Sequence, residues 1–196
     1  MKKKILILVI ALVIALTCLA ACDDYTSSLQ QIQSLLKVDY TEVVLSVVTT
    51  TNGVTLNGSY TLSFDGDVTT VVYDYYRLNE LDKNGNNADS YLTRVQGVVT
   101  VQDGKIVDGD ESVDLPQEVN FGGISFKQAF FTNVNTTAAK FDADVSNPQG
   151  FTGNNSLVCS DMHVMVMYSQ TALSTIVLNY VSERGSDVKI TYSFIN

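Results

Sequence analysis

A period of two in the hydrophobic pattern, broken by turn dipeptides, dominates the segment from residue 42 to residue 79. Alternate residues of an extended strand share one face, so this period predicts strands with one apolar face. Asn52-Gly53 and Asp65-Gly66 separate three such runs, and both dipeptides favour the positive φ angles of tight hairpin turns. We therefore expect a three-stranded antiparallel meander. Its strands are expected at Glu42–Thr51, Val54–Phe64 and Val68–Asn79.

The rest of the chain adds two helical signals, two polar segments and more strands. Ser28–Val38 carries apolar residues at helical spacing and predicts a short amphipathic helix. Ser125–Asn133 predicts a helical turn capped by Ser125. Asp82–Ser90 and Asn147–Asn155 are polar and are expected to be loops. Further strands are expected at Tyr91–Gln102, Lys105–Val107, Thr136–Val145, Leu157–Tyr168, Ala172–Ser182 and Asp187–Ile195.

The order of these elements predicts a mainly β (α+β) fold. We expect one strongly curved antiparallel meander sheet, half-barrel-like, with an N-terminal helix and a short central helix. A β-sandwich and a small closed barrel are the alternatives, because element order alone does not decide closure. This order resembles the open half-barrel domains of LolA- and LppX-like lipid carriers, an architectural likeness without a shared motif.

The first 22 residues have the organisation of a secretion signal. Three lysines, Lys2 to Lys4, precede an unbroken apolar run over residues 5–16. This run is well short of the roughly 20 residues that a membrane-spanning helix needs. The following Leu19-Ala20-Ala21-Cys22 resembles the lipobox of bacterial lipoproteins. The resemblance implies cleavage between Ala21 and Cys22 and a diacylglycerol thioether on Cys22. A plain secretory signal and a retained membrane helix are the alternatives.

Cleavage at this point would leave a lipidated tether over residues 22–27 and a single β-rich domain over residues 28–196. It removes three of the 12 basic residues and none of the 21 acidic ones, so the net charge changes from −9 to about −12. This charge repels nucleic acid and anionic headgroups, so we expect no nucleic-acid partner. Membrane contact is expected through the Cys22 lipid, on the extracytoplasmic face of a cell membrane. Cys159 would be the one cysteine left for the folded domain.

No pattern of catalytic or cofactor-binding residues stands out. The chain has one histidine, His163, and no serine or cysteine in a nucleophile-elbow sequence. Its aspartates gather at turns, where Asp is favoured because it bonds to the local backbone. We therefore expect a protein that is not an enzyme and that holds no cofactor.

One expected strand carries soft metal ligands at alternate positions. They are Cys159, His163, Met165 and Met167, with Asp161 among them. In a regular strand such side chains share one face, with neighbours about 6.5–7 Å apart. Thiolate, imidazole and thioether groups suit Cu(I), so these residues form a candidate metal site. The alternative is that the sulfur side chains fill an irregular core.

Aromatic residues on neighbouring strands form a candidate ligand face. They are Tyr60, Phe64, Tyr73, Tyr75 and Tyr91. Packing inside a β core is their alternative role. The function we expect is a non-catalytic binding or envelope-maintenance lipoprotein that holds a hydrophobic or small ligand in the concave face of its sheet. The alternative is a structural or adhesive surface protein that presents loops 82–90 and 147–155 to a protein or glycan partner.

Overall fold

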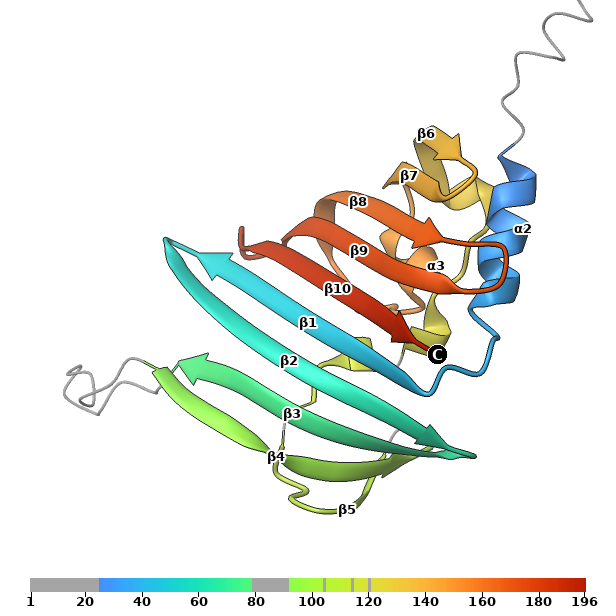
Figure 1. The fold of residues 1–196 in the computed structure, drawn as a ribbon. Coiled ribbons are helices and arrows are strands. Elements are labelled where there is room, and N and C mark those ends of the chain that lie inside the picture. The colour runs from blue at the N-terminus through green and yellow to red at the C-terminus, as the bar shows by residue number, and fades with distance from the viewer. Residues whose placement is uncertain (1–24, 79–91, 104, 114, 120) are drawn as a thin grey trace, which may run out of the picture.

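The computed structural model describes residues 25–78, 92–103, 105–113, 115–119 and 121–196. Ten strands and two α-helices make up most of these residues (Figure 1). The strands are β1 (Glu42–Thr51), β2 (Val54–Asp65), β3 (Val68–Leu78), β4 (Leu92–Gln102), β5 (Lys105–Asp108), β6 (Phe131–Thr137), β7 (Lys140–Val145), β8 (Cys159–Tyr168), β9 (Leu173–Ser182) and β10 (Asp187–Ile195). The helices are α2 (Thr26–Leu35) and α3 (Pro148–Thr152), and the 3-10 turns are η1 (Gln117–Val119), η2 (Phe121–Gly123) and η3 (Gln128–Phe130).

All the described strands belong to one antiparallel sheet, in the order β5-β4-β3-β2-β1-β10-β9-β8-β7-β6. The first and last strands therefore pair in the middle, with Val43 opposite Phe194 and Thr50 opposite Asp187. The outermost strands β5 and β6 do not pair, so the sheet stays open and curves strongly (Figure 1). The predicted mainly β, half-barrel-like fold is confirmed, and the sandwich and closed-barrel alternatives are wrong.

The predicted meander is also confirmed. β1, β2 and β3 pair in sequence, and the register places Val43 opposite Leu62 and Leu62 opposite Val71. The first turn has positive φ angles at both central residues, 50° at Asn52 and 80° at Gly53. These angles match the right-handed twist of the flanking strands, which explains why this dipeptide predicts the hairpin.

The core lies on one face of the sheet, called here the inner face. α2, α3 and the segment between β5 and β6 lie on this side (Figure 1). α2 starts and ends slightly earlier than the predicted Ser28–Val38, and it buries Leu29, Ile32 and Leu35. Its polar side chains hold it in place: Gln33 Oε1 accepts a hydrogen bond from the Phe126 N–H over 2.7 Å. The largest fully buried side chains include Leu45, Leu62, Phe141, Phe151, Ile176, Leu178, Ile190 and Tyr192.

The segment predicted as a second loop, Asn147–Asn155, contains a helix instead. The Asn147 side chain accepts a hydrogen bond from the Gly150 N–H over 2.9 Å, and Pro148 occupies the first turn of α3. Gly153 ends the helix with a φ of 71°. These are ordinary start and stop signals of a helix, and the apolar Phe151 between them is fully buried.

Two further expectations between residues 125 and 145 are wrong. Within Ser125–Asn133 only the single turn η3 is helical, Lys127 takes its cap position, and β6 begins at Phe131. The predicted single strand Thr136–Val145 is instead the end of β6, a turn and β7. Phe126, Phe131, Phe141 and Phe151 pack edge to face or stacked. This tertiary packing decides the local structure in place of helical propensity.

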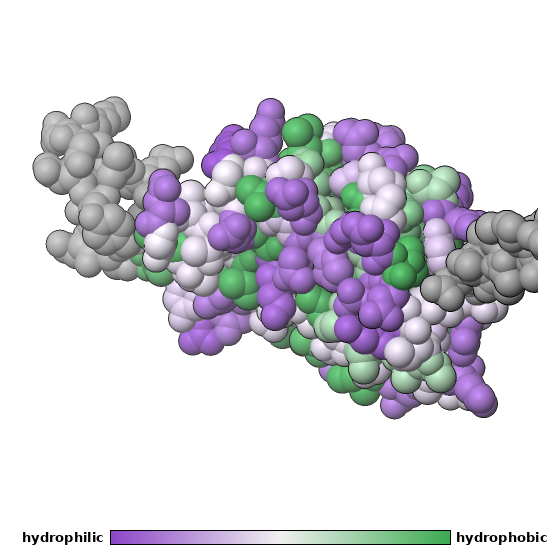
Figure 2. Space-filling view, turned by 90° about the horizontal axis from the view of Figure 1, so that it is seen from above, coloured by the Kyte–Doolittle hydropathy of each residue, from purple (hydrophilic) through white to green (hydrophobic). Residues whose placement is uncertain are grey.

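The molecular surface carries both hydrophobic and hydrophilic residues (Figure 2). Hydrophobic residues are interspersed with hydrophilic ones in the view of Figure 2. Among the described residues, no helix has the length and apolar composition that a bilayer crossing needs.

Candidate binding cleft

The predicted aromatic ligand face lies largely inside the core. Tyr60 and Tyr73 are each only 5% exposed, and Tyr75 is half-buried. The ring of Tyr75 lies 6.1 Å from that of Tyr60 and 6.0 Å from that of Tyr73, measured between centroids. Phe64 is exposed near the turn after β2, and Tyr91 lies outside the described residues. These tyrosines pack against each other and offer little free surface for stacking.

The predicted soft-metal residues lie on two opposite faces of the sheet, because β8 contains a bulge. Ser160 pairs with Val181 and His163 pairs with Asn179, so the β8 side has one extra residue. Asp161 accommodates it with a φ of 53°. An extra residue reverses the side-chain alternation before it. Cys159 therefore packs against the core on the inner face.

His163, Met165 and Met167 lie beyond the bulge and point to the outer face, so the four predicted ligands are not brought together. Burial raises the pKa of the Cys159 thiol, which disfavours the thiolate that a soft metal needs. Among the described residues, no group of three or more His, Cys, Asp or Glu side chains is arranged to hold a metal ion.

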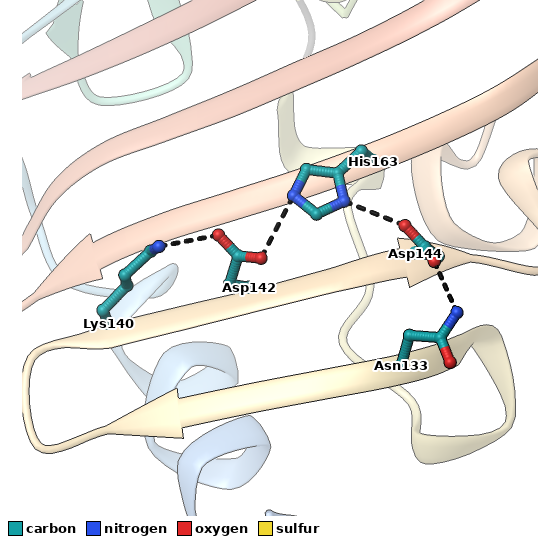
Figure 3. Close-up of polar contacts among 5 residues, drawn as sticks. All are labelled: Asn133, Lys140, Asp142, Asp144 and His163. Atoms are coloured by element: carbon teal, nitrogen blue, oxygen red, sulfur yellow. Dashed lines mark hydrogen bonds and ion pairs between the residues drawn. The ribbon is translucent and has the colours of Figure 1, made fainter.

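His163 instead belongs to an outer-face network across β6, β7 and β8 (Figure 3). Its Nε2 lies 3.2 Å from Asp142 Oδ1, and its Nδ1 lies 3.0 Å from Asp144 Oδ1. Lys140 Nζ lies 2.8 Å from Asp142 Oδ2, and Asn133 donates to Asp144 Oδ2 over 2.7 Å. The bonds from Asn133 and His163 lower the pKa of Asp144. The network links neighbouring strands at the surface and leaves no carboxylate oxygen unengaged.

A cleft of about 90 Å³ lies under the inner face of β9 and β10. The sheet forms one wall, and η1, η2 and the end of α3 form the other. The lining residues are Gln117, Glu118, Gly123, Ile124, Thr152, Gly153, Asn154, Leu157, Leu178, Tyr180, Ile190 and Tyr192. Aliphatic side chains thus share the lining with a few polar groups, which is the usual composition of a small-ligand site.

Two glycines, Gly123 and Gly153, allow η2 and the end of α3 to pack closely in the wall of the cleft opposite the sheet. A Cβ at Gly153 would lie 2.8 Å from the Gly123 carbonyl oxygen, and one at Gly123 would lie 2.9 Å from the Thr152 carbonyl oxygen. Only residues without a side chain let these two backbones approach so closely. The Ser125 N–H adds a hydrogen bond of 2.8 Å to the Phe151 carbonyl oxygen. The contact fixes η2 against α3.

Two tyrosine hydroxyls and a carboxylate are among the polar groups of the cleft. The Tyr192 hydroxyl donates to the Glu118 carbonyl oxygen over 3.1 Å. Burial first, and the Glu118 carboxylate second, raise the pKa of both Tyr180 and Tyr192. Both side chains therefore stay neutral phenols at neutral pH. The sequence patterns place Tyr180 and Tyr192 in strands but do not single them out, and Glu118 lies in an irregular segment without a periodic signal.

Comparisons with known proteins add little. No family model matches the sequence, and no curated protein gives a significant match. Among solved structures, the chain is similar to an N-terminal dehydratase from the difficidin assembly line. The two are 8% identical, 86% of this chain and 82% of that chain are covered, and the TM-score is 0.16. A likeness at this score carries no argument about fold or function.

Proposed function

We propose that the chain is a membrane-anchored extracytoplasmic lipoprotein whose β domain binds a small, partly apolar ligand without catalysis. The cleft under β9 and β10 is the observation that carries the binding role. Its volume of about 90 Å³ is below the roughly 150 Å³ of a cavity that takes up benzene. The cleft therefore suits a group of a few heavy atoms, or one end of a larger ligand.

The lipobox-like sequence Leu19-Ala20-Ala21-Cys22 supports the lipid anchor, and the anchor in turn limits how far the domain can lie from the membrane. Thr26, the first residue of α2, follows Cys22 by four residues. An extended chain spans at most about 3.5 Å per residue, so this tether reaches about 14 Å. The start of α2 then lies close to the lipid surface.

The adhesive alternative rests on two loops and receives no support from them. Residues 82–90 lie outside the described residues. Residues 147–155 contain α3, whose Phe151 is buried in the core.

The proposal is tested on the mature protein purified from membranes, with mass spectrometry of its N-terminus and an NMR titration with n-butanol. We expect a chain that begins at lipidated Cys22, and amide shifts confined to cleft residues such as Leu178 and Ile190. Leu157→Trp should abolish these shifts, because Leu157 lines the cleft and a larger side chain there fills its space. Val158→Trp is the matched control. Val158 is the next residue after Leu157, but its side chain is 54% exposed and lies outside the cleft.

Either of two results would contradict the proposal. An unlipidated N-terminus contradicts the anchor. Butanol-induced shifts that persist in Leu157→Trp, or an absence of shifts with butanol and with its charged analogues alike, contradict the cleft.

A further inference from the structure

The charge of the cleft indicates which ligands it accepts. Among the described residues that line it, Glu118 is the only one with a charged side chain. Glu118 lines the same cleft as Tyr180 and Tyr192, and its charge raises the pKa of both phenols. The cleft thus combines one negative charge with two neutral phenols, the neutral polar side chains of Gln117, Thr152 and Asn154, and several aliphatic side chains.

The Glu118 carboxylate has no compensating partner in the described part of the chain. No described lysine or arginine lies within ion-pair distance of it. Glu118 itself is half-buried, so bulk water screens its charge less than it screens a surface carboxylate. An unpaired charge in such a place favours an incoming group of opposite sign.

Tyr180 adds an unused polar group beside this charge. Its side chain is 9% exposed, and its hydroxyl has no hydrogen-bond partner among the described residues. The Tyr192 hydroxyl is already bonded to the Glu118 backbone. A ligand in the cleft therefore meets one free phenol oxygen and one carboxylate, both able to accept a hydrogen bond from an N–H donor.

We propose that the cleft binds the positively charged end of a small organic cation, an ammonium group on a short aliphatic chain. This inference rests on the proposed binding function of the cleft and specifies its ligand. Glu118 supplies the charge, Tyr180 supplies an oxygen acceptor, and Ile124, Leu157 and Leu178 contact the aliphatic part. The acidic surface, with a net charge of −9 for the whole chain, raises the local concentration of cations.

The same charge argues against anionic ligands. A fatty-acid carboxylate or a phosphate would enter beside Glu118 with no basic lining residue to bind it. The negative charge of such a ligand and that of the Glu118 carboxylate would repel each other more strongly in a partly buried site than in bulk water.

The test compares n-butylammonium, n-butanol and butyrate, three probes of similar size and different charge, by NMR titration of the mature protein at neutral pH. We expect n-butylammonium to bind about tenfold more tightly than n-butanol, as a charge-assisted hydrogen bond predicts, and butyrate not to bind. Glu118→Gln should bring the ratio of amine to alcohol affinity close to one. Tyr180→Phe should weaken amine binding. Glu183→Gln, which neutralises an exposed carboxylate outside the cleft, should keep the wild-type ratio.

The outcomes separate this inference from the proposed function. Equal affinity of the wild type for n-butylammonium and n-butanol overturns the charge preference and leaves the binding cleft in place. A preference that survives in Glu118→Gln, in a variant whose thermal unfolding matches the wild type, also overturns it. Failure of all three probes to bind overturns both proposals.

Discussion

A single buried hydroxyl, that of Tyr40, joins two distant parts of the molecule. It donates to the Leu35 carbonyl oxygen at the end of α2 over 2.9 Å, and it accepts from the Leu173 N–H at the start of β9 over 2.9 Å. Its ring lies 4.8 Å from that of Phe194, between centroids. Burial raises the pKa of Tyr40, so the phenol stays protonated and keeps its donor. Tyr40 therefore fixes the helix against the sheet.

Replacing Tyr40 with Phe should lower the free energy of unfolding by about 1–3 kcal/mol, because the buried groups of Leu35 and Leu173 lose their partner. Urea unfolding measures this change. Tyr76→Phe is the control, since Tyr76 is 41% exposed, and it should change stability by less than about 0.5 kcal/mol. Equal stabilities of the two variants would show that the Tyr40 bonds contribute nothing.

Asp144 makes stability depend on pH at the acid end. Its pKa is lower in the folded protein, first because Asn133 donates to its carboxylate and then because His163 does. Because folding lowers the pKa of Asp144, its contribution to the free energy of unfolding is complete above the ordinary aspartate pKa of about 3.9. The contribution disappears as the pH falls through the folded pKa.

We expect Asp144→Asn to reduce the loss of thermal stability on acidification, measured as the melting temperature between about pH 2 and pH 6. Asn133→Ala should reduce the pH dependence in part. Asn135→Ala, the exposed neighbour on β6, should keep the wild-type dependence. Identical slopes for Asp144→Asn and the wild type would rule out this role of Asp144.

At the scale of elements, turns with strong local chemistry were predictable and the bulge was not. The dipeptide Asn52-Gly53 carries its own φ preference, so the sequence predicts both the turn and the strands beside it. The bulge at Asp161 has no such signature. The strands β8 and β9 pair on both sides of the bulge, and Met162 within it is buried. A strand predicted without the extra residue places Cys159 on the outer face, where the structure has it on the inner face. The metal hypothesis depended on that one residue.

The helix α3 was not predicted for a different reason, because the sequence does contain signals for its start and its end. Asn147, Pro148 and Gly153 are a typical cap, first-turn residue and terminator. Their spacing leaves a helix of only five residues, too short to show a hydrophobic period. Such a helix is stable because tertiary packing supports it, and here Phe151 provides that packing.

Asn147→Ala should therefore lower the free energy of unfolding by about 1 kcal/mol, the usual cost of losing an N-cap. Hydrogen exchange should accelerate at the amides of α3 and of Ser125, whose N–H bonds to Phe151. Asn155→Ala, which follows the helix, is the control and should leave both unchanged. An unaltered exchange rate at Ser125 would show that the cap does not stabilise this wall of the cleft.

At the scale of the whole molecule, the cleft was beyond prediction because its described lining residues come from five separate segments of the chain, those of η1, η2, α3, β9 and β10. Glu118, Gly153, Tyr180 and Tyr192 meet only after the sheet has curved over η1, η2 and α3. The hydrophobic pattern predicts which face of each strand is buried. It contains no information on where that burial is incomplete, and a cleft is such a place.

The pairing of β1 with β10 sets the order in which the molecule can be completed. β1 pairs with β2 through a two-residue turn, yet its other neighbour is the last strand described. During synthesis the meander therefore emerges with β1 as an open edge, and its inner face is apolar at Val43 and Leu45. That edge must wait for residues 187–195 before it gains a partner. A chain synthesised from its N-terminus can therefore form the β1–β3 meander early, but the two halves of the sheet join only after residues 187–195 have been made.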